Sequence, residues 1–266
     1  MKLTNLKIYI SDSLDKIYPD TEIEAFFYRL LDYRLGLSRI DMVLNPDKLI
    51  NEEDKTFFEE AILQLKHEKP IQYILGETTF YGLSFKVNEF TLIPRPETEE
   101  LVNWIIEDFK GVNTQRTLSI LDIGTGSGCI PISLAKNLQG ATVEAIDVSK
   151  KALNIAEENA NLNKVDIQFI HKDILSTEND SDGLPKYDII VSNPPYVREL
   201  EKEEIKKNVL DYEPHLALFV ENTDALLFYR KITAYALKRL KDDGALYFEI
   251  NQYLGKETVD LIKQMG

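Results

Sequence analysis

The chain has 266 residues, of which 44% are hydrophobic and 29% charged, and these values are typical of a globular protein with a sizeable core. Its formal net charge of -14 argues against a protein that grips long duplex nucleic acid, because such proteins neutralise phosphates with Lys and Arg. We find no apolar run long enough for a transmembrane helix and no signal peptide. One cysteine, Cys129, excludes an internal disulfide, and three histidines offer no zinc-ligand spacing. We therefore expect a cytoplasmic protein with no membrane segment and no metal site.

Residues 1–75 predict a small helical domain. One helix face repeats at the i, i+3, i+4, i+7, i+8 spacing through Ile23, Phe26, Phe27, Leu30 and Leu31. A second helix is expected after Asn51, because Asn is a common N-cap and acidic residues fill the turn that follows.

Residues 76–96 predict a β-hairpin linker. The stretch from Thr78 to Val87 alternates in character and contains a glycine, as hairpins do. Pro94 and Pro96 then exclude a central strand or a helix interior, although Pro96 suits the first turn of a helix that runs to Phe109.

Residues 97–266 alternate between strand and helix patterns. The expected strands are 117–122, 142–147, 166–170, 187–192 and 245–250, and the expected helices between them include 130–137, 149–161 and 224–241. Such alternation predicts an α/β domain with a parallel sheet and helices on both faces. Ligands of such sheets bind beyond the carboxyl ends of the strands.

A glycine-rich loop follows the first of these strands, with the sequence DIGTGSG from Asp122 to Gly128. The third glycine comes one residue too early for a dinucleotide fingerprint. The spacing instead resembles motif I of class I methyltransferases, in which the loop backbone faces the methionine part of the cofactor. The candidate cofactor residues in the loop are Gly124, Thr125, Gly126, Ser127 and Gly128.

Two carboxylates follow the next two strands. Asp147 is placed to accept hydrogen bonds from both ribose hydroxyls of a nucleoside, as the acidic residue of dinucleotide-binding folds does. Asp173 is placed to accept from an adenine amino group, and Ile174 offers an apolar contact. The alternative for Asp147 is a purely structural role as a helix cap before Ser149.

The fourth strand runs directly into Asn193-Pro194-Pro195-Tyr196, the candidate catalytic motif. Methylation of a planar nitrogen is favoured when a site accepts both N–H hydrogens and holds the nitrogen as it becomes cationic. The Asn193 side-chain oxygen and the Pro194 carbonyl are the two acceptors, and Pro195 fixes the direction of that carbonyl. Tyr196 supplies an aromatic face. The alternative is that these four residues form only a turn.

These motifs, together with PIQYILG (70–76), FYG (80–82) and PRPETE (94–99), resemble the bacterial PrmC/HemK family of release-factor glutamine methyltransferases. The resemblance implies a Rossmann-like, class I fold with an N-terminal helical domain that helps dock the substrate. It implies that S-adenosylmethionine is consumed to S-adenosylhomocysteine, that residues 124–128, Asp147 and Asn193 contact the cofactor, and that residues 193–196 hold the substrate glutamine. That glutamine is the one in the Gly-Gly-Gln motif of peptide-chain release factors.

Two departures from the family pattern stand out. Ile174 occupies a position that is often aromatic in the family, which weakens the expected contact with adenine. Relatives also continue past the position of Gly266 into a final β-hairpin, so that hairpin is expected to be missing here.

Other substrates share the same motif. A glutamine of a large-subunit ribosomal protein is one, although the Arg95–Glu99 run resembles the release-factor branch more closely. The adenine amino group of DNA or RNA is another, and the acidic balance argues against it. A non-catalytic interaction module is disfavoured because both motifs are intact. We expect a monomer that binds release factors as its protein substrate and binds no nucleic acid stably.

Overall fold

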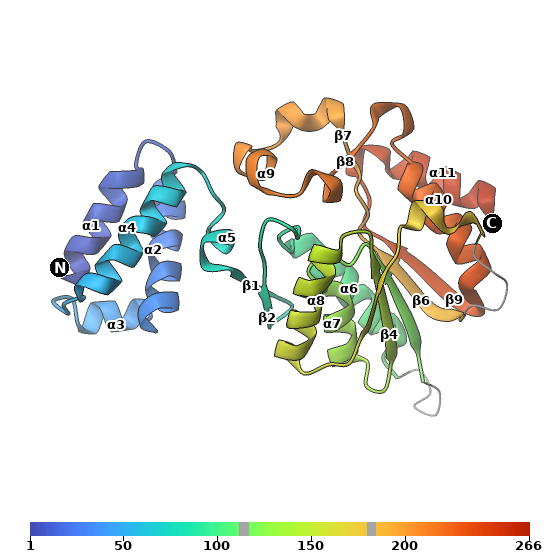
Figure 1. The fold of residues 1–266 in the computed structure, drawn as a ribbon, viewed down its shortest axis with the longest axis horizontal. Helices are drawn as coiled ribbons and strands as arrows, with labels where there is room; N and C mark the ends of the chain where they lie inside the picture. The colour runs from blue at the N-terminus through green and yellow to red at the C-terminus, as the bar shows by residue number, and fades with distance from the viewer. Residues whose placement is uncertain (112–116, 180–184) are drawn as a thin grey trace. The chain divides into compact units, whose positions relative to one another are not determined.

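The computed structural model describes residues 1–111, 117–179 and 185–266, which form two units (Figure 1). The first unit comprises Met1–Gly76 and Lys207–Tyr212, and the second comprises Glu77–Lys206 and Glu213–Gly266. This division differs from the three parts expected from the sequence. The hairpin belongs to the second unit instead of forming a separate linker, and a short segment from the second half of the chain joins the helical unit.

The first unit is a helical bundle. Its helices are α1 (Leu3–Leu14), α2 (Asp20–Leu35), α3 (Arg39–Leu44), α4 (Glu52–Lys66), α5 (Ile71–Leu75) and α9 (Lys207–Tyr212). The predicted apolar face of α2 is confirmed, since Ile23, Phe27, Leu30 and Leu31 are buried in one core. The predicted cap of α4 is confirmed as well, because the Asn51 side chain accepts a hydrogen bond from the backbone amide of Asp54 at 2.7 Å.

The second unit begins with the predicted hairpin, formed by the antiparallel strands β1 (Glu77–Phe80) and β2 (Leu83–Lys86). Tyr81 and Gly82 form its two-residue turn with positive φ angles of 48° and 73°, the backbone that matches the twist of paired strands. Helix α6 (Pro96–Phe109) follows, and Pro96 lies in its first turn as predicted.

A five-stranded parallel sheet forms the centre of this unit. Its strands are β3 (Ser119–Ile123), β4 (Thr142–Asp147), β5 (Gln168–His171), β6 (Tyr187–Ser192) and β9 (Leu240–Phe248), in the spatial order β5-β4-β3-β6-β9. The chain builds outward from β3 to β5 and then returns to β6 on the other side of β3. A crevice beyond the carboxyl ends of β3 and β6 is where such sheets bind ligands.

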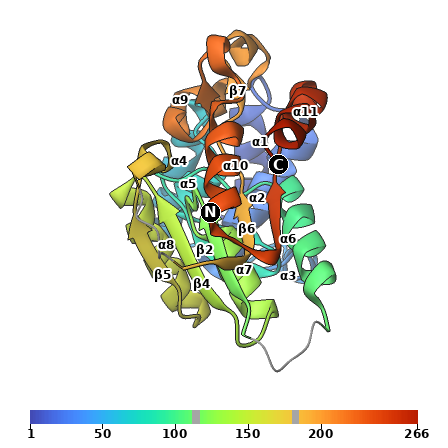
Figure 2. The same cartoon turned by 90° about the vertical axis from the view of Figure 1, so that its right-hand side faces the viewer.

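Helices cover both faces of the sheet. On one face α6, α7 (Cys129–Asn137) and α8 (Lys150–Asn163) share a core with Ile120 and Ile189. On the other, α10 (Leu227–Arg239) packs against Leu121 and Ile190, and it crosses the near side of the sheet in Figure 2. The remaining elements are η1 (Ile174–Asn179), β7 (Val197–Arg198), η2 (Glu199–Glu204), η3 (His215–Ala217), β8 (Phe219–Val220), η4 (Asn222–Asp224), η5 (Gln252–Leu254) and α11 (Gly255–Met265).

The last strand begins earlier than the sequence predicted. The expectation was 245–250, whereas β9 starts at Leu240, which pairs with Tyr187 before the register shifts. The polar run from Lys241 to Asp243 resembles a loop, yet Lys241 forms an ion pair with the buried Asp188 at 2.7 Å. The start of this strand could not be predicted from local sequence, because the partner that stabilises Lys241 there is a buried residue 53 positions away.

Candidate active site

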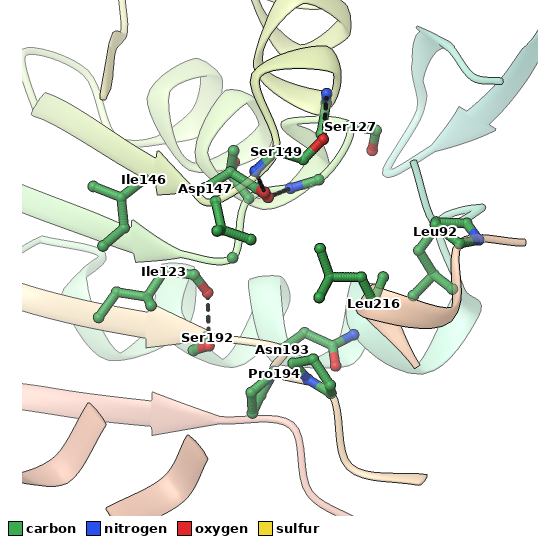
Figure 3. Close-up of a pocket in the computed structure, with 18 of the residues that line it drawn as sticks. Leu92, Ile123, Ser127, Ile146, Asp147, Ser149, Ser192, Asn193, Pro194 and Leu216 are labelled. Atoms are coloured by element: carbon green, nitrogen blue, oxygen red, sulfur yellow. Dashed lines mark hydrogen bonds between the residues drawn. The ribbon is translucent and has the colours of Figure 1, made fainter. Parts of the chain in front are cut away.

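A cavity of about 300 Å³ lies beyond the carboxyl ends of β3, β4 and β6. This volume is at the lower end of the range for small-molecule sites. Most of the predicted site residues line it, namely Gly124, Thr125, Gly126, Ser127, Asp147, Asp173, Ile174, Asn193, Pro194 and Pro195. Figure 3 shows Asp147 and Ser149 on one side of the open space and Asn193 and Pro194 on the other. Gly128 and Tyr196 are not among the lining residues.

The glycine loop presents its backbone to this cavity. Gly124 and Gly126 have positive φ angles of 77° and 54°, and a Cβ atom on either would meet nothing within 4 Å. Gly128 is different, because a Cβ there would lie 3.0 Å from the side chain of Ile132 and 3.1 Å from that of Ala156. The first two glycines therefore leave room for a ligand, whereas the third permits close packing of α7 on α8.

Asp147 ties the loop to the end of β4. One carboxylate oxygen accepts a hydrogen bond from the amide of Gly126 at 2.8 Å, and the other accepts from the amide of Ser149 at 2.8 Å (Figure 3). Burial nevertheless raises the pKa of Asp147, and the backbone hydrogen bonds only partly offset this. The N-cap of α8 is Ser149, whose hydroxyl accepts from Ala152. Asp147 is thus not the cap of this helix, and its oxygens keep further lone pairs on the cavity side of the loop.

Asp173 and Ile174 lie where β5 leads into η1. The Asp173 carboxylate accepts hydrogen bonds from the amide of Leu175 at 2.9 Å and from the hydroxyl of Ser176 at 3.2 Å. Ile174 is buried in the core beneath α10 and still lines the cavity. The turn therefore holds the Asp173 carboxylate in place at the cavity wall.

The Asn-Pro-Pro-Tyr motif begins directly after β6. The Asn193 side-chain amide donates a hydrogen bond to the hydroxyl of Thr98 at 3.2 Å. Tyr196 donates its hydroxyl hydrogen to Glu249 at 2.9 Å, and burial together with this carboxylate raises the pKa of Tyr196. Both ends of the motif are thus fixed by side chains outside it.

Comparison with known proteins identifies the family. Residues 8–76 match the family described as the PrmC N-terminal domain, and residues 105–215 match the Methyltransferase small domain. The chain is 60% identical to the release factor glutamine methyltransferase of Flavobacterium psychrophilum, over 99% of this chain and 92% of that protein. The chain belongs to the release factor glutamine methyltransferase family.

The chain is also similar to a second curated relative and to a solved structure. The release factor glutamine methyltransferase of Bacteroides thetaiotaomicron is 43% identical, over 98% of this chain and 91% of that protein. Among solved structures, the chain is similar to a ribosomal protein L11 methylase from Lactobacillus delbrueckii subsp. bulgaricus, with 24% identity and a TM-score of 0.44 over 66% of this chain and 71% of that one. Family membership confirms the resemblance seen in the motifs and, with the parallel sheet, the predicted class I, Rossmann-like fold. The chain is therefore an S-adenosylmethionine-dependent methyltransferase.

The residues around the cavity fit S-adenosylmethionine as the methyl donor. The open space beside Gly124 and Gly126 lets a ligand approach the loop backbone closely. The buried carboxylate of Asp122 makes no hydrogen bond with any described residue, and Asp147 lies near enough to act on it electrostatically. Asp147 brings a carboxyl group to one end of this largely apolar cavity, which suits a ligand that carries positive charge. Residues 124–127 and Asp147 would hold this cofactor.

Asp122, which lies just before the glycine loop, is a buried carboxyl group that the sequence analysis did not single out, and it does not itself line the cavity. Its side chain is fully buried, and burial raises its pKa to about 7, while the nearby Thr125 hydroxyl offsets this only partly and does not reach hydrogen-bond geometry. The signal was present in the sequence, since an acidic residue at the end of an apolar strand is costly to bury without a partner.

Thr98, Glu249 and Arg95 were missed for another reason. Thr98 and Arg95 belong to the quoted 94–99 motif but were given no role in the site, and they line the cavity; Glu249 bonds to both Thr98 and Tyr196. Arg95 is held at 2.6 Å by the buried carboxylate of Glu213. No local pattern predicts these contacts, because each joins segments more than 50 residues apart.

The described residues contain neither a candidate membrane span nor a candidate metal cluster. No helix there is long and apolar enough to cross a membrane. Within residues 1–111, 117–179 and 185–266, no group of three or more His, Cys, Asp or Glu side chains is arranged to hold a metal ion.

Proposed function

We propose that this enzyme methylates the side-chain amide nitrogen of the glutamine in the Gly-Gly-Gln motif of peptide-chain release factors. The relatives that match almost the full chain are named release factor glutamine methyltransferases, at identities of up to 60%. The Asn-Pro-Pro-Tyr motif is intact and lines the cavity with Asn193, Pro194 and Pro195, which supports the same chemistry.

One observation carries the proposal: the orientation of Asn193. Its amide NH2 donates to Thr98, so its Oδ1 is the atom left to accept a hydrogen bond from a substrate. The carbonyl of the buried Pro194 is the second acceptor. Together they match the two N–H hydrogens of a primary amide, which is the group at the end of a glutamine side chain.

These acceptors act on the substrate nitrogen. S-adenosylmethionine supplies an electrophilic methyl group when it is bound. The glutamine nitrogen forms a bond to that carbon as the carbon–sulfur bond breaks, and the sulfur keeps the electron pair. Asn193 and Pro194 stabilise the positive charge that develops on the nitrogen, because both present oxygen dipoles toward its hydrogens. The product cation is acidic, so its proton passes to solvent without a strong base.

The helical unit is proposed to help dock the release factor. Ile40, Val43 and Leu44 of α3 are 70%, 75% and 71% exposed, which is unusual for aliphatic side chains that lie next to one another. Changing all three to Ser should raise the KM for a whole release factor and leave the KM for a short Gly-Gly-Gln peptide unchanged. Equal KM values for the whole factor in variant and wild type would remove α3 from docking.

The proposed reaction is tested with recombinant, unmethylated release factor and S-adenosylmethionine. We expect peptide mass spectrometry to find one added methyl group on the Gly-Gly-Gln glutamine and none when that glutamine is replaced by Ala. Parallel reactions contain an adenine-bearing oligonucleotide or large-subunit ribosomal proteins. Transfer to either of those, with none to the release factor, would overturn the proposal.

A further inference from the structure

We propose that Glu249 and Thr98 are positioning residues that fix which way the Asn193 amide points. This inference rests on the proposed function and deepens it, because it concerns how the same site presents its acceptor to the substrate amide. Thr98 lies in α6, and Glu249 directly follows β9, so neither residue belongs to the catalytic motif.

Glu249 bonds to both sides of the motif. Its backbone amide donates to the carbonyl of Ser192 at 3.1 Å, which places it beside Asn193. One carboxylate oxygen accepts from the Thr98 hydroxyl at 2.7 Å, and the other accepts from the Tyr196 hydroxyl at 2.9 Å. The Glu249 carboxylate therefore bonds directly to Tyr196, and it is connected to Asn193 through the Thr98 hydroxyl.

The number of hydrogens that each group can donate determines the direction of these bonds. An ionised carboxylate only accepts, so the one hydroxyl hydrogen of Thr98 is committed to Glu249. The Thr98 oxygen can then only accept from its other neighbour, Asn193. Asn193 must turn its NH2 group toward Thr98 and its Oδ1 away from it.

The reverse orientation of Asn193 would be unproductive. It would point an NH2 group at the NH2 group of the substrate glutamine, and two donors repel each other. Thr98 is only 2% exposed, so water is not available to take the place of its hydroxyl. The direction set by Glu249 is therefore transmitted to the atom that faces the substrate.

Neighbouring bonds hold Glu249 itself in place. Tyr229 donates its hydroxyl hydrogen to the Glu249 backbone carbonyl at 3.3 Å. Asn251, two residues on, donates its side-chain NH2 to the backbone carbonyl of Tyr196 at 2.9 Å. The end of β9 and the catalytic motif thus form one connected hydrogen-bond network.

The test compares Thr98→Val with Thr98→Ser, using the full chain, S-adenosylmethionine and recombinant release factor. Val keeps the shape of the side chain but removes the hydroxyl that links Glu249 to Asn193, whereas Ser keeps that hydroxyl. We expect kcat to fall about tenfold in Thr98→Val, the effect of losing roughly one hydrogen bond that acts on the transition state. Thr98→Ser should stay within about threefold of wild type, and calorimetry should show unchanged cofactor affinity in both. Thr233→Val is the matched control, because Thr233 is equally buried and its hydroxyl has no partner among the described residues.

Glu249→Gln provides an independent variant. It should lower kcat severalfold in the wild-type background and have little further effect in Thr98→Val, because the hydroxyl that links Glu249 to Asn193 is already absent. Glu144→Gln is its control, since Glu144 also accepts a tyrosine hydroxyl bond, from Tyr187 at 2.7 Å. Equal kcat in Thr98→Val and wild type, or equal losses in the Val and Ser variants, overturns the inference. Absence of release-factor methylation by the wild-type enzyme would instead refute the proposed function.

Discussion

The carboxylate of Asp147 accepts a hydrogen bond from the backbone amide of Gly126 at 2.8 Å. This bond joins the end of β4 to the glycine loop after β3, so the two parts of the cofactor site hold each other in place. Because Ser149 caps α8, the Asp147 carboxylate is free of the capping role that the sequence left open. It shapes the loop and faces the cavity at the same time.

Asp147→Ala should weaken S-adenosylmethionine binding by about tenfold to a hundredfold, because charge-assisted hydrogen bonds contribute roughly 1.5–3 kcal/mol each. Turnover at saturating cofactor should change much less. Isothermal titration calorimetry measures the affinity, and Ser149→Ala serves as a control that weakens the cap of the same helix start. Unchanged affinity in Asp147→Ala would mean that this carboxylate only supports the loop.

Asn193→Ala should lower kcat by roughly 10²–10³-fold, the usual cost of losing one preorganised group that stabilises developing charge. Cofactor affinity should fall less, since the other cofactor residues lie across the cavity (Figure 3). Single-turnover methylation of a release factor measures the chemical step directly. Near-normal turnover would remove Asn193 from the catalytic role.

Gly126→Ala and Gly128→Ala should fail in different ways. A Cβ on Gly128 would press on Ile132 and Ala156, so this variant should lose about 1–3 kcal/mol of unfolding free energy. A Cβ on Gly126 meets no protein atom and lines the cavity, so this variant should mainly lose cofactor affinity. Thermal unfolding and calorimetry separate the two effects, and both variants also carry backbone strain from positive φ. Similar changes in both measurements would show that the two glycines do the same job.

Local patterns predicted most of the fold and most of the candidate site. The strands that end at Ile123, Asp147 and Ser192 are short apolar runs followed by turn residues, and such signals lie within a few positions of each other. The glycine loop and the Asn-Pro-Pro-Tyr motif are equally local. Since the carboxyl ends of parallel strands lie at one edge of a sheet, the strand assignment alone predicted that the glycine loop and the Asn-Pro-Pro-Tyr motif lie close together.

Contacts between distant segments could not be predicted in this way. Thr98 and Glu249 are 151 positions apart, and nothing around either residue indicates that they bond. The packing role of Gly128 depends on how closely α7 approaches α8, which the motif does not encode. The missed residues are thus the ones whose roles depend on tertiary packing.

Asp122 should make the stability of the cofactor-free enzyme depend on pH. Its pKa is about 7 in the folded protein against an ordinary value of 3.8, so the folded state binds the proton more tightly than the unfolded chain. Stability is therefore lost as the pH rises from about 4 to about 7, and the cost is complete above 7. Each unit of pH in that window costs about 1.4 kcal/mol, which gives roughly 2–3 kcal/mol between pH 5 and pH 8.

Asp122→Asn removes this titration and should raise the melting temperature more at pH 8 than at pH 5. We expect the rise in melting temperature to be larger at pH 8 than at pH 5 by about 5 °C or more, measured by differential scanning fluorimetry without cofactor. Asp166→Asn, at an exposed position, is the control and should show no such separation. An equal effect of Asp122→Asn at both pH values would mean that this carboxyl does not change its charge between them.

The direction of the hydrogen bonds that link Glu249, Thr98 and Asn193 predicts a compensating pair of substitutions. In Asn193→Asp, the residue at 193 becomes an acceptor on both sides, and Thr98 has one hydrogen for two carboxylates, Asp at 193 and Glu249. We expect kcat to fall more than tenfold, because the unpaired carboxylate loses its fixed position.

Adding Glu249→Gln to Asn193→Asp reverses the chain of donors. The NH2 group of the glutamine introduced at position 249 donates to the Thr98 oxygen, and the Thr98 hydroxyl then donates to the aspartate introduced at position 193. The Tyr196 hydroxyl donates to the side-chain oxygen of the new glutamine in place of Glu249. The double variant should recover kcat severalfold relative to Asn193→Asp, although Glu249→Gln alone lowers it. Steady-state kinetics of all four proteins form the cycle, and purely additive losses would show that hydrogen-bond direction does not limit this active site.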